Sequence, residues 1–353
     1  MINEKCFTKE RINEFRKQKE YRKINPPVLE KMINALYLLQ LLSKSEIKFT
    51  FKGGTSLILL LNKARRFSVD IDILTLESRE VIEKALTSIV DDSHFSSWEL
   101  DKKRSYNSGV PKAHYELFYD SELQKGPGYI ILDILFEESI YPKTQESEIK
   151  SEWIESTEVI TVTTPTIESI LGDKLTAFAP TTTGIMYGKG KGQEIIKQLF
   201  DVSCLYDEVE NITDVFDSFH TTVQKELMYR NLEISEEKVL DDIINTSILI
   251  AKREKNKLPQ EKIYFKELQQ GIKQFGSFLI EGSFTIEDAI IASAKSAILA
   301  NRLKKNDHSK LPVHINQDVT KLSIEGDLSF LNKLKKLKDK SAFFYWWNVI
   351  NEL

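Results

Sequence analysis

The feature that most constrains the fold is a change in hydrophobic periodicity near Pro165, in a chain of 353 residues. Before Pro165, several short segments alternate apolar and polar residues or are apolar throughout, which is typical of strands. After it, apolar residues recur every three to four positions, the spacing of amphipathic helices. The pattern predicts an α+β protein, with an α/β domain over residues 1–165 and a helical domain over residues 166–353.

The run Tyr129–Phe136 is apolar on both faces, so we expect it to be the central strand of a sheet. Further strands are expected at residues 48–52, 69–74, 95–105, 112–121 and 159–163. Helices are expected at residues 8–23, 26–43, 55–61 and 78–90 in the first domain, and at 165–179, 193–208, 211–231, 234–252, 263–282, 285–305 and 327–353 in the second.

Composition excludes several classes of protein. Lys and Arg total 49 against 53 Asp and Glu, so the chain is not a uniformly basic nucleic-acid coat. Cys6 and Cys204 lie far apart without a Cys/His cluster, which excludes a disulfide framework and a structural zinc site. The charged N-terminus is not a signal peptide, and no apolar run approaches the length of a membrane span. We therefore expect a cytoplasmic protein.

Residues 52–74 (KGGTSLILLLNKARRFSVDIDIL) carry the most informative chemistry. Gly53 and Gly54 lie between an expected strand and an expected helix, where glycine lets the backbone approach a phosphate and the helix N-terminus offers free N–H groups. Asp70 and Asp72 are two apart on a strand and so project from one face. Paired carboxylates beside a phosphate-binding turn suit Mg²⁺ bound to a nucleoside triphosphate.

Asp133 is the one polar residue within the run Tyr129–Phe136, and an unpartnered buried carboxylate would cost several kcal/mol. Metal ions shared with Asp70 and Asp72 would provide partners, as in a two-metal nucleotidyl transfer site. Each feature alone has a simpler explanation: a GG pair is usually only a turn, a DxD is seldom a metal site, and Asp133 could cap a strand end. The combination, in this order, favours nucleotidyl transfer.

These residues resemble the first motif of the AbiEii/AbiGii toxin family, a branch of the polymerase-β-like nucleotidyltransferases. The family pattern K-G-G-T-x-L followed by R-F-S-x-D-I-D is matched by Lys52, Gly53, Gly54, Thr55 and Leu57, then by Arg66, Phe67, Ser68, Asp70, Ile71 and Asp72. The family's Lys on a later helix is matched by Lys174, and its R-D-L-Y-D-L helix by Gln198–Val202. There Asp201 retains the second Asp, whereas Gln198 replaces the first.

The resemblance implies a small mixed sheet with flanking helices, followed by a helical domain. Together with the residues, it predicts three groups of site residues. The catalytic residues are Asp70, Asp72, Lys174 and Asp201; the nucleotide-binding residues are Gly53, Gly54, Thr55, Arg66, Ser68 and Lys174; the metal ligands are Asp70, Asp72 and Asp133. Mg²⁺, with Mn²⁺ as an alternative, is the expected metal, and a nucleoside triphosphate the expected substrate.

Two of these residues can also be considered without the family. Lys174 lies within an apolar helical stripe, so its ammonium has either to snorkel to solvent or to meet an anion. Asp201 falls on the polar side of its helix, where a solvated pair with Lys197 explains it. Only the resemblance makes Asp201 an active-site residue, as a base for the acceptor hydroxyl.

The segment 181–192 is rich in Thr, Gly and Lys. Tyr187, Lys189 and Lys191 suit the backbone and a stacked base of a nucleic acid. A flexible surface loop explains them equally well.

The resemblance implies a toxin of a bacterial toxin–antitoxin or phage-defence (abortive infection) system. We expect Mg²⁺-dependent transfer of nucleotides to an RNA acceptor, the 3′ end of tRNA, with a cognate antitoxin as a partner. The alternatives are transfer to a small molecule or a protein side chain, and a nucleotide-binding module without turnover.

Overall fold

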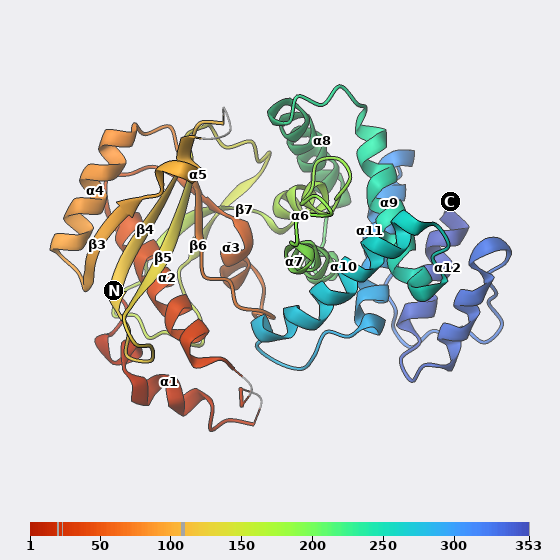
Figure 1. Cartoon of the computed structure of the whole chain (residues 1–353), viewed down its shortest axis with the longest axis horizontal. Coiled ribbons are helices and arrows are strands. Elements are labelled where there is room, and N and C mark those ends of the chain that lie inside the picture. Colours follow the sequence, from red (N-terminus) through yellow and green to blue (C-terminus); the bar gives the residue numbers. More distant parts are fainter. Residues whose placement is uncertain (20, 23, 107–109, 353) are drawn as a thin grey trace. The chain divides into compact units, whose positions relative to one another are not determined.

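The computed structural model describes residues 1–19, 21, 22, 24–106 and 110–352. The chain forms two compact units: residues 1–166 with 277–282, and residues 167–276 with 283–353 (Figure 1). The first unit combines sheets and helices and the second is helical, which confirms the α+β class.

The first unit is built on a five-stranded sheet in the order β1-β2-β5-β4-β3. Its strands are β1 (Thr50–Lys52), β2 (Ile71–Leu74), β3 (Phe95–Leu100), β4 (Lys112–Asp120) and β5 (Pro127–Leu135). β2 and β5 are parallel and the other neighbours antiparallel, so the sheet is mixed. β5 is its central strand, as its apolar sequence predicts. It starts at Pro127, two residues before the predicted start at Tyr129.

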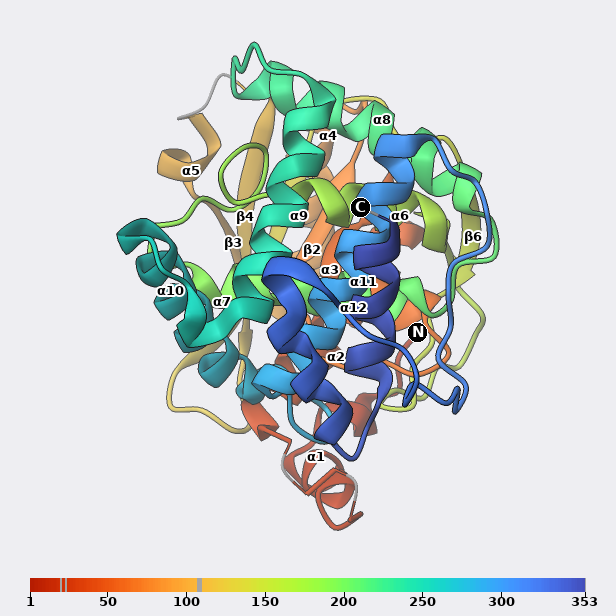
Figure 2. The same ribbon diagram turned by 90° about the vertical axis from the view of Figure 1, so that its right-hand side faces the viewer.

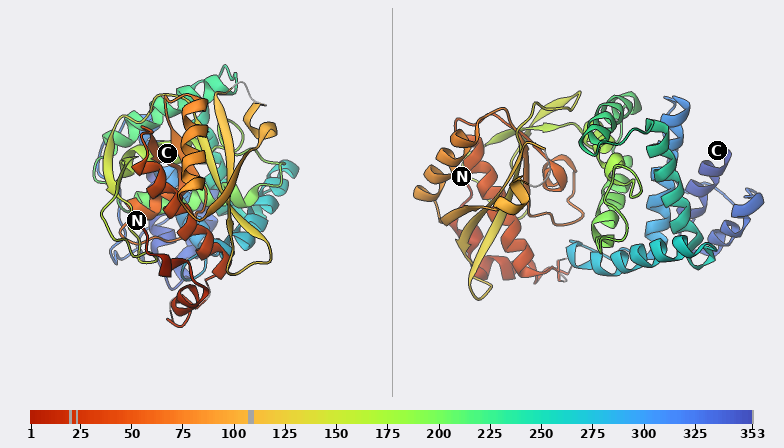
Figure 3. Two further views of the ribbon diagram at one scale, coloured as in Figure 1. Left: turned by 90° about the vertical axis from the view of Figure 1, so that its left-hand side faces the viewer. Right: turned by 45° about the horizontal axis from the view of Figure 1, so that its top comes forward.

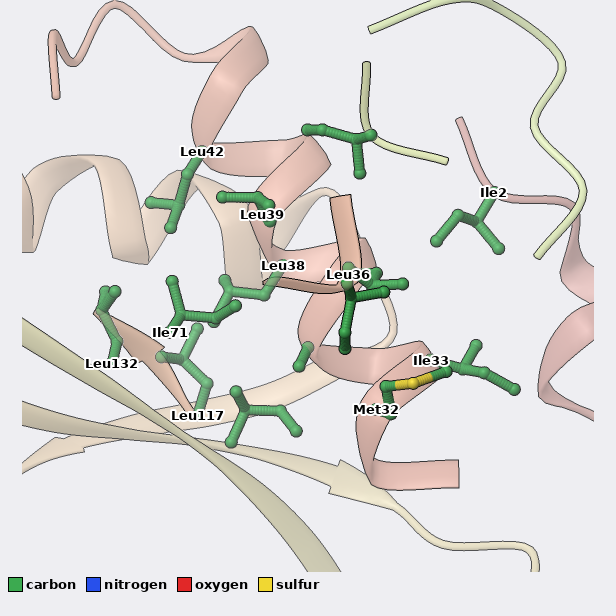
Figure 4. Packing of buried hydrophobic residues seen from close by; sticks show 14 of the residues in the cluster. Ile2, Met32, Ile33, Leu36, Leu38, Leu39, Leu42, Ile71, Leu117 and Leu132 are labelled. Atoms are coloured by element: carbon green, nitrogen blue, oxygen red, sulfur yellow. The ribbon is translucent and has the colours of Figure 1, made fainter. Parts of the chain in front are cut away.

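Two helices, α2 (Pro26–Lys44) and α4 (Arg79–Asp91), cover one face of this sheet (Figure 3). Leucines of α2 pack against Ile71, Leu117 and Leu132 of three adjacent strands (Figure 4). Alternate residues of β2, β4 and β5 face this core, so the residues between them lie on the opposite face. That opposite face carries the polar residues of the site.

A second sheet of two antiparallel strands, β6 (Thr144–Glu148) and β7 (Thr161–Pro165), completes the first unit together with α1 (Lys9–Phe15), α3 (Gly53–Leu60) and α5 (Lys102–Tyr106). β6 has the polar sequence TQESE and is mostly exposed. It has no hydrophobic alternation, which is why the sequence did not predict it.

The second unit consists of helices α6 (Ile167–Ala177), α7 (Gly192–Tyr206), α8 (Ile212–Tyr229), α9 (Glu236–Lys252), α10 (Pro259–Phe275), α11 (Ile286–Lys305) and α12 (Ser341–Glu352). α11 packs against α7, α9 and α12 (Figure 2), and its middle, Ala289–Asn301, is buried apart from Ile291. No helix in the described part of the chain is long and apolar enough to cross a lipid bilayer.

Several predicted elements differ from the structure at their ends. The strand expected at 69–74 begins only at Ile71, so Asp70 lies before it. The helix expected at 8–23 ends at Phe15, with residues 20 and 23 outside the described residues, and the strand expected at 95–105 ends at Leu100. There the Asp101 carboxylate accepts a hydrogen bond from the Arg104 N–H at 3.0 Å and starts α5 instead. The helix expected at 263–282 ends at Phe275, and the last one divides into a 3₁₀ helix (Gly326–Lys336) and α12.

Candidate functional site

The glycine turn joins β1 to α3 with a backbone that requires glycine. Gly53 has φ of +79°, and a Cβ there would lie 2.1 Å from Oδ2 of Asp72. The Thr55 hydroxyl donates to the carbonyl oxygen of Asp70 at 2.5 Å, which ties α3 to the segment before β2. The turn therefore brings the first turn of α3 against the Asp72 carboxylate.

A second close approach occurs at Gly54. A Cβ there would lie 2.6 Å from Nη2 of Arg66 and 2.9 Å from Oγ of Ser68. Arg66 is buried, and its Nη1 donates to the carbonyl oxygen of Phe67 at 3.0 Å. A guanidinium, a hydroxyl and a helix N-terminus thus converge at one glycine, an arrangement suited to an anion.

Residues 277–282, which follow α10, hold this arginine segment in place. Phe67 N–H donates to the carbonyl oxygen of Phe278 at 2.8 Å, Ile280 N–H donates to that of Arg65 at 3.2 Å, and Arg66 forms a β-bridge with Leu279. A segment about 210 residues away in sequence therefore fixes Arg66. No local sequence signal predicts this contact.

Strand register places the polar side chains in one row across the sheet. Lys52 pairs with Asp72, Asp72 with Asp133, and Asp133 with His114. Residues directly opposite each other on adjacent strands project from the same face. Asp133 therefore lies on the same face as Asp72, on the neighbouring strand. Asp70 lies just before β2, outside the strand in which the sequence predicts it.

Asp133 has two side-chain partners in the protein. Its Oδ1 forms a short hydrogen bond with Nδ1 of His114, and its Oδ2 lies 3.7 Å from Nη2 of Arg104. The sequence argument that Asp133 needs partners is thus met first by His114 and Arg104. Sequence reasoning missed His114. The alternation of β4 does put it on the polar face, but the register that pairs it with Asp133 cannot be read from the sequence.

The carboxylates of Asp70, Asp72 and Asp133 have the oxygen chemistry that Mg²⁺ prefers. Within the described residues, no group of three or more His, Cys, Asp or Glu side chains is arranged to hold a metal ion. Mg²⁺ is commonly held by one or two carboxylates with waters and substrate phosphates. A neighbouring carboxylate pair beside an anion-binding turn fits that mode of binding, and the metal ligands stay a prediction.

In the second unit, Lys174 of α6 meets an anion within the protein. Its Nζ lies 3.0 Å from Oδ2 of Asp201 and 3.2 Å from Oε1 of Gln198, both on α7. The Asp201 side chain is 1% exposed and that of Lys174 8%. The interpretation of Asp201 as half of a solvated pair with Lys197 was wrong, because α6 covers that side of α7. Lys197 pairs with Glu194 at 2.9 Å.

The segment 181–192 is held at several points rather than free. Oδ2 of the buried Asp242 accepts from Thr181 N–H at 2.7 Å and from the Thr182 hydroxyl at 2.9 Å. Burial raises the pKa of the Asp242 carboxyl. The Tyr187 ring stacks on Tyr264 with centroids 4.0 Å apart.

Lys189 and Lys191 are exposed. Because Tyr264 covers one face of the Tyr187 ring, only the other face could stack on a base. RNA binding by Tyr187, Lys189 and Lys191 stays a prediction.

The predicted site residues fall into two groups. The first unit brings together the glycine turn, Thr55, Arg66, Ser68, Asp72 and Asp133 of the sheet, and Asp70 just before β2. The second unit brings Lys174 to Asp201 and adds Gln198 to them.

No curated protein matches the chain in sequence. Among solved structures, the chain is similar to the crystal structure of JHP933 from Helicobacter pylori, with TM-score 0.45 and 15% identity over 81% of this chain and 97% of that one. It is also similar to a putative nucleotidyltransferase from H. pylori, with TM-score 0.43 and 15% identity over 80% and 97%.

The sequence profile of the nucleotidyl transferase AbiEii toxin family, of type IV toxin–antitoxin systems, matches residues 37–274. This match spans more than half of the chain and includes the glycine turn, the strands with the three aspartates, and the Lys174 and Asp201 helices. The chain therefore belongs to the AbiEii nucleotidyl transferase toxin family.

Proposed function

We propose that this protein transfers a nucleotide from a nucleoside triphosphate to the 3′ end of an RNA acceptor, tRNA, in a Mg²⁺-dependent reaction that stops growth. The observation that carries the proposal is the pairing of Asp72 with Asp133 on one sheet face, beside the N-terminus of α3. That pairing supports nucleotidyl transfer. The RNA acceptor rests on the family resemblance.

The first task of the site is to bind the triphosphate. Backbone N–H groups at the start of α3, together with Arg66 and Ser68 at Gly54, are suited to its outer phosphates. The same donors stabilise the negative charge that develops on pyrophosphate as it leaves. Arg66 is held in place by its β-bridge to Leu279 and by the hydrogen bond from its side chain to the Phe67 carbonyl oxygen, so these donors need little rearrangement.

The second task is to hold the reacting phosphorus and the attacking hydroxyl. Asp70, Asp72 and Asp133 would hold Mg²⁺, which when bound neutralises phosphate charge and makes the acceptor hydroxyl a better nucleophile. His114 contacts one oxygen of the Asp133 carboxylate and Arg104 lies near the other. We propose that these two residues orient the Asp133 carboxylate toward the acceptor.

The test uses purified full-length protein, bulk bacterial tRNA, Mg²⁺ and each α-labelled nucleoside triphosphate in turn. The expected result is label on tRNA, lost on adding a chelator and restored by Mg²⁺. Label on protein or on a small molecule would support the alternative acceptors. Binding without transfer to any acceptor would contradict the proposal.

Growth provides a second test of the toxin assignment. Expression of the wild-type protein in a bacterial host should slow growth, and Asp72→Ala should abolish this effect at equal protein level. Equal growth of the two strains would argue against a toxin that acts through this site.

A further inference from the structure

An aromatic pair lies on the same sheet face as the site carboxylates. Phe118 of β4 is the direct cross-strand partner of Tyr129 of β5, and their ring centroids are 6.0 Å apart. Tyr129 is 39% exposed, which is unusual for a large aromatic side chain on a central strand. No part of the function described above uses this pair.

The pair lies at a defined distance from the reacting centre. Tyr129 and Asp133 are four residues apart on one strand, so their positions differ by about 13 Å along the sheet. The even spacing puts Tyr129, Asp133 and the Asp133 partner His114 on one face. A nucleoside could therefore span the interval, with its sugar hydroxyl toward Asp133 and its base on the aromatic pair.

The position of the aromatic pair relative to the phosphate donors indicates whether this nucleoside belongs to the acceptor or to the incoming triphosphate. Phosphate donors gather at Gly54 beside β1 and β2, whereas the aromatic pair lies on β5, the strand that carries Asp133, and on β4, the next strand away from β2. In phosphoryl transfer the attacking and leaving oxygens lie roughly in line, on opposite sides of the phosphorus. With pyrophosphate leaving toward α3, the attacking hydroxyl approaches from the side of β5 and β4.

Lys31 belongs to α2, which covers the opposite face of the sheet, but its ammonium reaches the Tyr129 ring. Its Nζ lies 4.4 Å from the centroid of the Tyr129 ring. Burial lowers the pKa of this ammonium, and the nearby carboxylates of Asp70 and Glu116 partly offset that effect. A half-buried cation over an aromatic ring, close to the site carboxylates, suits the negative backbone of a nucleic acid next to a stacked base.

We propose that Phe118, Tyr129 and Lys31 form an acceptor platform, on which a base near the 3′ end of the RNA stacks while Lys31 faces its backbone. This inference rests on the proposed function, because it assigns the acceptor to one side of that site. It requires no sequence preference, since every base offers a π-face for stacking.

The first experiment measures contact directly in the wild-type full-length chain. A short single-stranded oligoribonucleotide with 5-iodouridine as its last or its next-to-last nucleotide is bound and irradiated, and the cross-linked residue is mapped by mass spectrometry. Cross-linking to Tyr129 or Phe118 is expected. Cross-links confined to other residues would overturn the proposal.

The second experiment measures affinity for the same unmodified oligonucleotide. Tyr129→Ala should weaken binding about 10-fold, within the range for loss of one stacked base, and Tyr129→Phe should bind like wild type because it keeps the ring. Leu76→Ala is the matched control, since Leu76 is an apolar side chain that is 75% exposed just after β2. Equal binding by wild type and Tyr129→Ala would overturn the proposal.

Transfer kinetics separate the acceptor from the incoming nucleotide. Tyr129→Ala should raise the KM for tRNA and leave the KM for the nucleoside triphosphate unchanged. A rise in the triphosphate KM alone would assign the platform to the incoming base and overturn the proposal. If the wild-type chain transfers nothing, the proposed function fails, while cross-linking and affinity still decide the platform. If Tyr129→Ala does not fold, cross-linking of the wild-type chain decides.

Discussion

The carboxylates of the two units differ in how far they are buried and in which partners they have. In the first, Asp133 keeps 26% of its side chain exposed and shares a sheet face with Asp72, which is also only half-buried. In the second, Asp201 is 1% exposed and pairs with Lys174 of the facing helix, whose ammonium also donates to Gln198. The first carboxylate has protein partners in His114 and Arg104 but stays partly exposed, whereas the second is almost fully buried with its lysine.

This difference separates binding groups from groups that also hold the fold together. Neighbouring half-exposed carboxylates repel one another, so their charge favours binding of a cation more than it favours stability. A buried ion pair contributes little net stability, yet it is costly to break because one charge then stays buried without its partner. Substitutions in the first unit should therefore lower the transfer rate, and substitutions in the second should lower the stability of the fold.

The largest effect is expected for Asp72→Ala in the first unit. Transfer should fall on the order of 10³-fold or more, because the carboxylate beside the triphosphate turn is lost. Thermal stability should be kept or slightly raised, since removing Asp72 relieves repulsion on the sheet face. Paired melting and single-turnover measurements check both.

Asp120→Ala, an exposed change at the far end of β4, is the control for Asp72→Ala and should alter neither property. A folded Asp72→Ala protein with wild-type turnover would remove Asp72 from the site.

The second prediction is that Lys174→Met acts first on stability. It should lower the free energy of unfolding by about 3–5 kcal/mol, because Asp201 loses its ammonium while it remains buried. Chemical denaturation measures the loss directly. A Lys174→Met protein as stable as wild type would show that Asp201 does not depend on this pair.

A double variant then separates fold from chemistry. Lys174→Met with Asp201→Leu replaces the buried pair by apolar groups, an exchange that is often neutral for stability. If the helices need the pair only for packing, this variant should be stable and active. The family resemblance predicts instead a stable protein that transfers at least about 10²-fold more slowly.

A smaller effect is expected for Gln198→Ala. Gln198 contributes one hydrogen bond to the Lys174 ammonium, and its loss should cost about 1 kcal/mol. Asp201 continues to neutralise Lys174, so the loss should be well below that of Lys174→Met. An equally large loss in both variants would mean that the amide, and not the carboxylate, holds the lysine.

The same contrast explains what sequence could predict. The central strand, the strand that carries Asp72 and the glycine turn all follow from local spacing and residue type, and they recur in the structure, although β2 begins at Ile71 and so leaves Asp70 outside the strand. The burial of Asp201 does not, because an amphipathic pattern treats the polar side of a helix as solvated. In the second unit α6, α10 and α11 all pack on α7, which leaves little of it exposed.

Long-range pairing is the other information that the sequence lacks. His114 beside Asp133 depends on strand register, and the β-bridge of Leu279 with Arg66 joins segments about 210 residues apart. Both contacts orient site residues, yet neither residue type nor spacing indicates them.

The smallest effect is expected for Lys31→Met. This is the same substitution as Lys174→Met, made at a half-buried lysine of the first unit. Burial lowers the pKa of Lys31 below its usual value of 10.5, so the folded state disfavours its charged form. That cost is fully present at neutral pH and disappears as pH rises through the folded pKa toward the unfolded one. Met keeps the packing of the stem without the charge, so Tm should rise by no more than a few degrees at pH 7. This gain over wild type should shrink above pH 10, as melting curves of both proteins at the two pH values would show. A lowered Tm at pH 7 would mean that the contacts of Lys31 with Tyr129 and Asp70 outweigh its burial, and the two lysines would then both be structural.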